Sequence, residues 1–132
     1  LPLAGLHLLL AEDNELNSEI ATTLLEEQGA SITAVENGRL ALEAIQNAAP
    51  RTYDAILMDV MMPEMNGLEA TRCIRAFEGK GPGEGTPIIA MTANVFADDV
   101  KACLDAGMNS HVGKPLDMKV LIGEILKYTN AR

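Results

Sequence analysis

Short apolar segments alternate along this chain with longer segments in which apolar residues recur every three or four positions. The short segments predict five strands, at about 6–11, 32–35, 55–59, 88–91 and 111–113. The longer segments predict five helices, at about 15–28, 40–48, 67–77, 98–106 and 117–128. Because the strands are apolar throughout and alternate with helices, we expect an α/β fold whose parallel sheet is covered by helices on both faces.

The helical periodicity also predicts which side chains face the sheet. The expected inward residues are Leu16, Ile20 and Leu24 in the first helix, Leu40, Ala41, Ala44, Ile45 and Ala48 in the second, Leu68, Thr71, Ile74 and Phe77 in the third, and Leu121, Ile125 and Tyr128 in the last. The Asn37-Gly38 pair predicts a turn, and Asp117 is expected to cap the last helix.

The length of 132 residues and the hydrophobic content of 48% fit one folded domain that spans 1–132. Within it, residues 1–5 are expected to form a lead-in segment, and the glycine-rich stretch 79–86 a flexible surface loop. Because the chain begins at Leu1 without a Met, we expect it to be part of a longer, multidomain chain.

The charge balance limits the partners of the domain. Ten basic and 19 acidic residues leave a net charge of −9, which disfavours direct binding to nucleic acid or to an anionic membrane surface.

Cys73 and Cys103 lie among apolar residues in predicted helices without a nearby His or Cys, so we assign them no chemical role. With no secretory signal and no apolar segment of membrane length, a reduced, cytoplasmic setting is expected.

Polar residues stand where four of the predicted strands end. Glu12 and Asp13 follow the first strand, and Asp59 ends the third. Thr92 follows the fourth strand and Lys114 the fifth. Singly, each has a simpler explanation, such as a helix cap for Asp13 or a solvated charge for Lys114. Because parallel strands bring their carboxyl ends to one edge, where open α/β sheets bind ligands, we expect the five residues to share one site.

The chemistry of these five residues favours a metal-assisted reaction. Three carboxylates a few ångströms apart repel one another and would take up protons unless a cation lies between them, which predicts a divalent metal site. A hydroxyl and an ammonium group beside such a site are typical of phosphoryl transfer.

Four segments carry a more specific pattern. They read AEDN at 11–14, LMDVMMPEMNG at 57–67, MTA at 91–93 and GKP at 113–115. In this order and at this spacing they resemble the signatures of the response-regulator receiver family, and the resemblance covers nearly the whole chain. It implies a flavodoxin-like, doubly wound (βα)5 fold with a five-stranded parallel sheet of order 2-1-3-4-5.

The resemblance also implies a role for each site residue. Asp59 would be the phosphoacceptor, and Glu12, Asp13, Asp59 and the backbone carbonyl of Met61 would hold Mg²⁺, with Mn²⁺ as an alternative ion. Lys114 and Thr92 would contact the phosphoryl oxygens. The product would be a hydrolysable aspartyl phosphate, so the domain would be a signalling phosphoacceptor with self-catalysed transfer and autohydrolysis rather than an enzyme.

The same resemblance implies a conformational switch made of Thr92 and of the residue three positions before Lys114. That residue is usually Tyr or Phe in the family but is His111 in this chain, which has a smaller, polar and titratable ring. Asn94, Ala93 and Pro115 are expected to border the site.

The partners implied by the resemblance are proteins that carry a phosphohistidine, either a histidine kinase or a histidine-phosphotransfer domain. The AEDN segment, Asn17 and the MPEMNG loop are most similar to receivers fused to hybrid sensor histidine kinases. The parent chain would then be a hybrid kinase, with this domain in the cytoplasmic part of a membrane-anchored sensor; a free-standing single-domain regulator, or one that has lost its output domain, is the alternative. The face formed by about 95–128 is where the family places phosphorylation-dependent contacts, including dimers.

Three alternatives remain open at this point. A phosphohydrolase of the haloacid-dehalogenase type also uses a strand-end Asp, Mg²⁺, Thr and Lys, but it needs a second Asp where this chain has Met61. A flavin or nucleotide binder would need a phosphate-binding loop rich in Gly, Ser or Thr after the first strand, and this chain lacks one. A receiver that docks a partner without being phosphorylated is disfavoured because the full set of acids, Thr92 and Lys114 is present.

Overall fold

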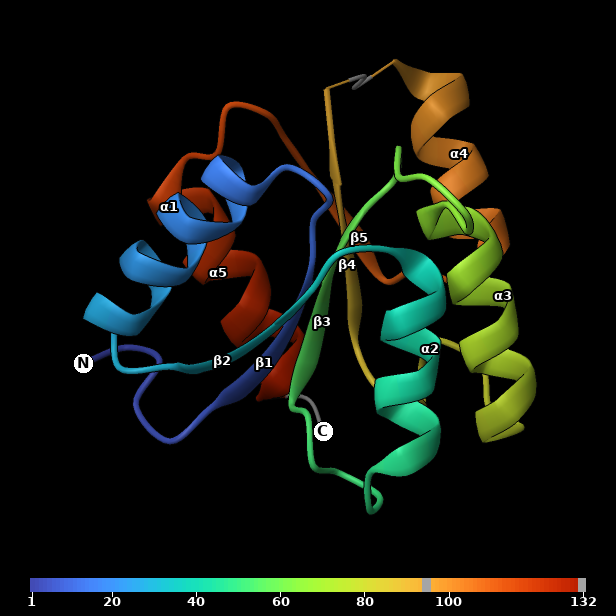
Figure 1. Cartoon of the computed structure of the whole chain (residues 1–132), viewed down its shortest axis with the longest axis horizontal. Helices are drawn as coiled ribbons and strands as arrows, with labels where there is room; N and C mark the ends of the chain where they lie inside the picture. Colours follow the sequence, from blue (N-terminus) through green and yellow to red (C-terminus); the bar gives the residue numbers. More distant parts are fainter. Residues whose placement is uncertain (94–95, 131–132) are drawn as a thin grey trace.

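The structure is a computed structural model that describes residues 1–93 and 96–130. Five strands alternate with five helices in the described residues (Figure 1). In chain order they are β1 (His7–Ala11), α1 (Glu15–Glu27), β2 (Ser31–Val35), α2 (Gly38–Asn47), β3 (Ala55–Asp59), α3 (Gly67–Glu78), β4 (Ile88–Thr92), α4 (Ala97–Ala106), β5 (Ser110–Gly113) and α5 (Met118–Thr129). All strand pairs are parallel and the order is β2-β1-β3-β4-β5, which confirms the predicted fold.

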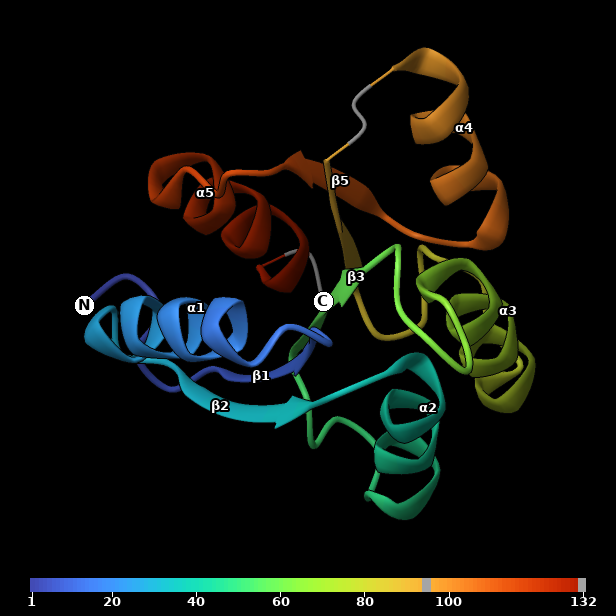
Figure 2. The same cartoon turned by 45° about the horizontal axis from the view of Figure 1, so that its top comes forward.

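The helices form two layers around the sheet. Helices α1 and α5 lie on one face, and α2, α3 and α4 lie on the other (Figure 2). The core is split accordingly into two clusters: Leu8, Leu10 and Leu57 pack toward α1 and α5, whereas Leu9, Ile56 and Met58 pack toward α2, α3 and α4. Strands β3 and β4 are buried along their whole length because both of their faces are covered, which explains their continuous apolar sequences.

Short polar side chains mark the beginnings of four helices. Asn14, Asn37, Asn66 and Asp117 each accept a hydrogen bond from a backbone N–H of the first turn. Asp117 is thus confirmed as a cap. The Asn37-Gly38 pair is the cap and first residue of α2 rather than a turn between elements, because the helix begins two residues earlier than predicted.

The predicted inward face of α1 is wrong. Leu16 and Ile20 are 64% and 50% exposed, whereas Ala21 and Leu25 are buried against the sheet. The helix carries two adjacent stripes of apolar residues, one with Leu16 and Ile20 and one with Ala21 and Leu25. Periodicity alone does not determine which of the two stripes packs against the sheet. Phe77 of α3 is also exposed, and the buried residues in the last turns of that helix are Ile74 and Arg75.

The lead-in segment is packed into the domain. Leu3 is fully buried in the cluster that contains Leu8 and Leu25, and its backbone N–H donates to the carbonyl of Gln28 over 2.9 Å. Gly29 has a φ of 101°, and a Cβ at that position would come within 2.9 Å of the Ala4 backbone. The segment therefore lies against the end of α1 as part of the fold.

The glycine-rich stretch between α3 and β4 is exposed at 80–84 and buried at Gly85 and Thr86. The buried Arg75 guanidinium donates to the carbonyls of Thr86 and Gly107 over 2.8 and 2.9 Å. The Asn109 amide donates to the Pro82 carbonyl over 2.7 Å. Hydrogen bonds thus join this loop to α3 and to the turn after α4. Within the described residues, no helix has the length and apolar character needed to cross a membrane.

Candidate functional site

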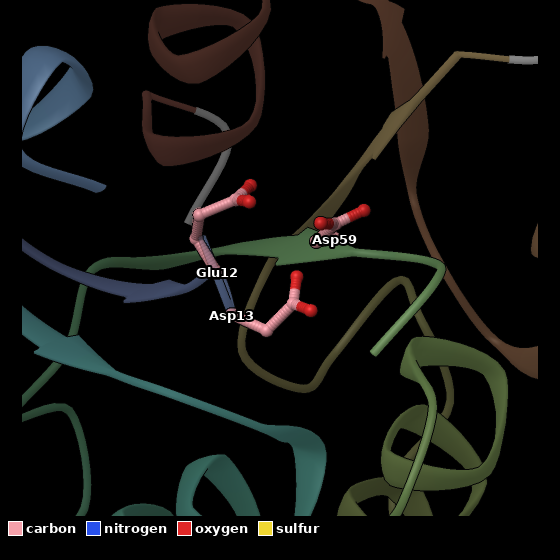
Figure 3. A group of neighbouring side chains, drawn as sticks. All are labelled: Glu12, Asp13 and Asp59. Atoms are coloured by element: carbon pink, nitrogen blue, oxygen red, sulfur yellow. The ribbon is translucent and has the colours of Figure 1, made fainter. Parts of the chain in front are cut away.

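Three carboxylates meet at the carboxyl edge of the sheet. Glu12 and Asp13 follow β1, and Asp59 ends β3, which pairs with β1 through Leu10 and Leu57. Figure 3 shows the Glu12 and Asp13 side chains extending toward Asp59. One carboxylate oxygen from each of the three residues lies within 4.8 Å of the others. The pairing of neighbouring parallel strands therefore brings Asp59 beside two acids that lie 46 and 47 positions earlier in the chain.

The three acids differ in their surroundings. Glu12 and Asp59 are each 5% exposed, whereas Asp13 is exposed to solvent. The backbone N–H of Asn14 donates to a Glu12 carboxylate oxygen, and that of Met61 donates to Asp59 Oδ1, each over 3.3 Å. Because Asn14 rather than Asp13 caps α1, the Asp13 carboxylate is not used as a helix cap and lies in the acidic cluster.

Lys114 lies between the two buried acids. Its Nζ is 3.0 Å from Glu12 Oε2 and 3.0 Å from Asp59 Oδ2. Its backbone N–H donates to the Thr92 carbonyl over 2.8 Å, which joins the ends of β4 and β5, and the peptide bond to Pro115 is cis.

Burial raises the pKa of Asp59 above its usual range, and the negative charge of Glu12 raises it further, while the hydrogen bond and charge of Lys114 oppose both effects. For Lys114, burial lowers the pKa, but the hydrogen bonds and charges of Glu12 and Asp59 outweigh it and leave the pKa raised. Lys114 is therefore the internal counter-ion of the cluster. Its charge only partly offsets the effects of burial and of Glu12 on Asp59, so the Asp59 pKa stays raised.

The donor set fits a hard divalent cation. Mg²⁺ binds oxygen ligands and keeps several water molecules, which suits a cluster with two buried carboxylates and one that faces solvent. Neither Cys lies in this cluster, so the ligands do not favour a soft metal.

The other predicted residues that the structure describes lie at or near the same edge. Thr92 is buried at the end of β4, the strand next to β3, where Met91 pairs with Asp59. His111 is half-buried in β5 and pairs with Ala90, two residues before Thr92. Met61, Ala93 and Pro115 are exposed beside the site, and Asn94 lies outside the described residues.

A groove that the sequence did not indicate opens beside the cluster. It has a volume of about 510 Å³, lies between α1 and the 114–116 segment that precedes α5, and includes Glu12 and Lys114. Its apolar lining is Leu10, Ile20, Ala21, Leu24, Met91, Pro115 and Leu116. The only sequence signal for it was the second apolar stripe of α1, which the periodicity assigned to the core.

Comparisons with known proteins agree with this architecture. Residues 8–126 match the family described as response regulator receiver domain. The sensor protein GacS of Pseudomonas syringae pv. syringae is 40% identical over 121 residues, which cover 92% of this chain and 13% of that protein. The chain therefore spans a small part of the length of this curated relative.

Two solved structures are also similar. The receiver domain of the sensor histidine kinase PA1611 from Pseudomonas aeruginosa PAO1, with a magnesium ion coordinated in its active site cleft, is 37% identical, with a TM-score of 0.83 over 96% of this chain and 99% of that one. The co-crystal structure of the Saccharomyces cerevisiae phosphotransfer protein Ypd1 with the receiver domain of its downstream response regulator Ssk1 contains a chain that is 25% identical, with a TM-score of 0.86 and coverages of 97% and 91%.

The family match does not favour the phosphohydrolase, the flavin or nucleotide binder, or the receiver that is only a docking module. It spans most of the chain and includes all five polar residues at the sheet edge. This chain belongs to the response regulator receiver domain family.

Proposed function

We propose that Asp59 accepts a phosphoryl group from a phosphohistidine in a phosphorelay, with a divalent cation held by Glu12, Asp13, Asp59 and the Met61 carbonyl. The observation that carries the proposal is the placement of Asp59 between two further acids and the Lys114 ammonium. The same acids fit Mg²⁺, with Mn²⁺ as a substitute. The PA1611 receiver, whose reported active site cleft coordinates magnesium, supports this choice of ion.

In the proposed reaction, an Asp59 oxygen forms a bond to phosphorus while the bond from phosphorus to the donor imidazole nitrogen breaks. The electron pair of that bond leaves with the imidazole, which takes up a proton. The cation would neutralise charge on the phosphoryl oxygens. Lys114, now 3.0 Å from Asp59 Oδ2, would pair with a phosphoryl oxygen, and the Thr92 hydroxyl would donate to another.

The groove beside the cluster is the proposed docking surface for the domain that carries the phosphohistidine. The phosphoryl donor must approach Asp59 directly, and the groove runs from Glu12 and Lys114 along α1. The exposed Leu16 and Ile20 would add apolar area to this contact. The Ypd1 and Ssk1 complex supports a histidine-phosphotransfer partner, and the sensor histidine kinase GacS of Pseudomonas protegens, which is 40% identical over 92% of this chain, supports a histidine kinase.

The consequences of phosphorylation form part of the same proposal. Thr92 would respond to the new charge, and His111, half-buried in β5, would change its rotamer in answer. Ala93, Pro115 and Asn94 would border the phosphoryl group, and Asn94 and Met61 would affect its autohydrolysis. The α4–β5–α5 face would carry phosphorylation-dependent contacts, including a dimer, and no direct contact with nucleic acid or membrane is expected. The parent chain would be a hybrid histidine kinase with this domain in the cytoplasm.

The test is to weigh the intact domain after incubation with a small phosphodonor, with and without Mg²⁺. We expect a mass gain of one phosphoryl group that requires the metal and is absent in Asp59→Asn. Sustained release of phosphate from small phosphoesters would favour a phosphohydrolase instead. Full labelling of Asp59→Asn at another residue would refute the assignment of the phosphoacceptor.

A further inference from the structure

The loop between β3 and α3 contains an unusual turn centred on Glu64. Its φ is 64°, in the left-handed region, and the N–H of Met65 donates to the Pro63 carbonyl over 2.7 Å. A turn closed between residues i and i+2 with a positive central φ is rare and strained. A non-glycine residue in this region persists where surrounding contacts hold it.

Contacts from the beginning of α2 hold this turn. Arg39 Nε donates to Glu64 Oε2 over 3.1 Å, and Asn37 Nδ2 donates to the same oxygen over 3.4 Å. The N–H of Gly38 donates to the Met65 carbonyl over 3.0 Å, and a Cβ at Gly38 would collide with that carbonyl. Asn37 is buried, and its other amide atom caps α2 through Leu40. The turn is therefore anchored by hydrogen bonds to the beginning of α2.

The other end of the same loop lies at the acidic cluster. The N–H of Met61 donates to Asp59 Oδ1 over 3.3 Å, and that of Val60 donates to the Met91 carbonyl over 3.2 Å. Met61 itself is 73% exposed, so side-chain packing does little to fix its backbone. The anchored turn three residues later limits the conformations that the Met61 peptide groups can adopt.

We propose that Glu64 is a positioning residue, held by Arg39 and Asn37, that orders the 61–65 segment for cation binding beside Asp59. The proposal rests on the proposed function, because it assigns the Met61 carbonyl to the cation. Glu64 does not touch the cluster and acts only through the loop.

Stability alone does not account for Glu64 at this position. The Arg39–Glu64 pair is about half exposed on both sides, and such pairs contribute little to the free energy of unfolding. A glycine would adopt the observed φ without strain. Glu64→Gly therefore removes the carboxylate while leaving the turn geometry accessible, which separates positioning from folding.

The chain offers a matched control. Arg39 Nη1 also pairs with Glu43 over 3.1 Å within α2, so Glu43→Gln removes one negative charge and one partner of the same arginine but leaves the loop anchored. Glu64→Gln tests rescue, because its amide oxygen can still accept from Arg39 and Asn37. The measurements are amide hydrogen exchange of 60–66 in the metal-free domain and the Mg²⁺ dependence of Asp59 labelling by a small phosphodonor.

We expect Glu64→Gly to speed exchange in the loop and to raise the Mg²⁺ concentration for half-maximal labelling about three- to tenfold, from the loss of one exposed ion pair and one hydrogen bond. The labelling rate at saturating Mg²⁺ should be unchanged, Glu43→Gln should match the parent, and Glu64→Gln should fall between. Unchanged exchange and Mg²⁺ dependence in Glu64→Gly would overturn the proposal, as would an equal effect of Glu43→Gln. Loop exchange in the metal-free domain does not depend on phosphorylation, so failure of the proposed function would be seen separately.

Discussion

The Lys114 ammonium lies 3.0 Å from a carboxylate oxygen of Asp59 and 3.0 Å from one of Glu12. Both acids are buried, and Lys114 is only a quarter exposed. Without a cation, Lys114 is the group that keeps two buried negative charges side by side. The group proposed to contact the phosphoryl oxygen thus also stabilises the metal-free domain.

Lys114→Met should destabilise the metal-free domain by about 2–4 kcal/mol, because it leaves two buried carboxylates without their common partner. Urea unfolding at neutral pH with a chelator measures this change. Lys101→Met is the control, since its pair with Asp105 is exposed and should contribute less than about 1 kcal/mol. Equal losses in the two variants would show that Lys114 is not a special counter-ion.

The stability of the metal-free domain should depend on the ionisation of Asp59. Its pKa is raised above the ordinary 3.8, so the folded state favours the protonated acid. Protonation of Asp59 therefore contributes to the stability of the folded domain. This contribution is fully present below the Asp59 pKa of the unfolded chain and is lost as pH rises through the Asp59 pKa of the folded domain. The amide side chain introduced in Asp59→Asn does not ionise, so this variant does not lose stability by this route. The free energy of unfolding of Asp59→Asn relative to the parent should therefore increase as pH rises from about 4 and then level off. Unfolding curves of both proteins across this range test the sign, and parallel pH profiles would contradict it.

Leu3→Ala should destabilise the domain by about 2–5 kcal/mol, although Leu3 precedes the first strand, because its side chain fills the core beneath α1. Thermal or urea unfolding measures the loss. Leu1→Ala is the control, since Leu1 is 81% exposed and its removal should change stability by less than about 0.5 kcal/mol. A core that tolerates both changes equally would mean that the lead-in segment does not pack in solution.

Ile20→Glu should slow phosphoryl transfer from a histidine-phosphotransfer domain at least about tenfold, because a charge replaces apolar area in the proposed docking groove. Labelling by a small phosphodonor should be unchanged, since that molecule does not need the groove. The control is Val120→Glu, which places the same charge on an exposed apolar position of α5. A loss with both donors would place the defect in the site, and a normal rate with both would exclude α1 from docking.

The sequence predicted correctly those features that depend on neighbouring residues or on the direction of the strands. The short apolar runs around Leu57 and Ile89 favoured buried strands, and strands joined by helices run parallel. Acids and a lysine placed after such strands must then lie at one edge, so the sequence alone assigns Asp13, Asp59 and Lys114 to a common region.

The sequence by itself determined the alternation of strands and helices, the family, and the identity of the polar groups at the sheet edge, because periodicity and motif spacing are encoded in neighbouring residues. Only the tertiary structure decided that Ala21 rather than Ile20 packs inward, that Leu3 belongs to the core, and that Arg39 holds Glu64 in its turn. Each of these three placements depends on contacts between segments that are distant in the chain. The energies of such contacts depend on the distances between the groups and on their burial, and neither is contained in a local sequence pattern.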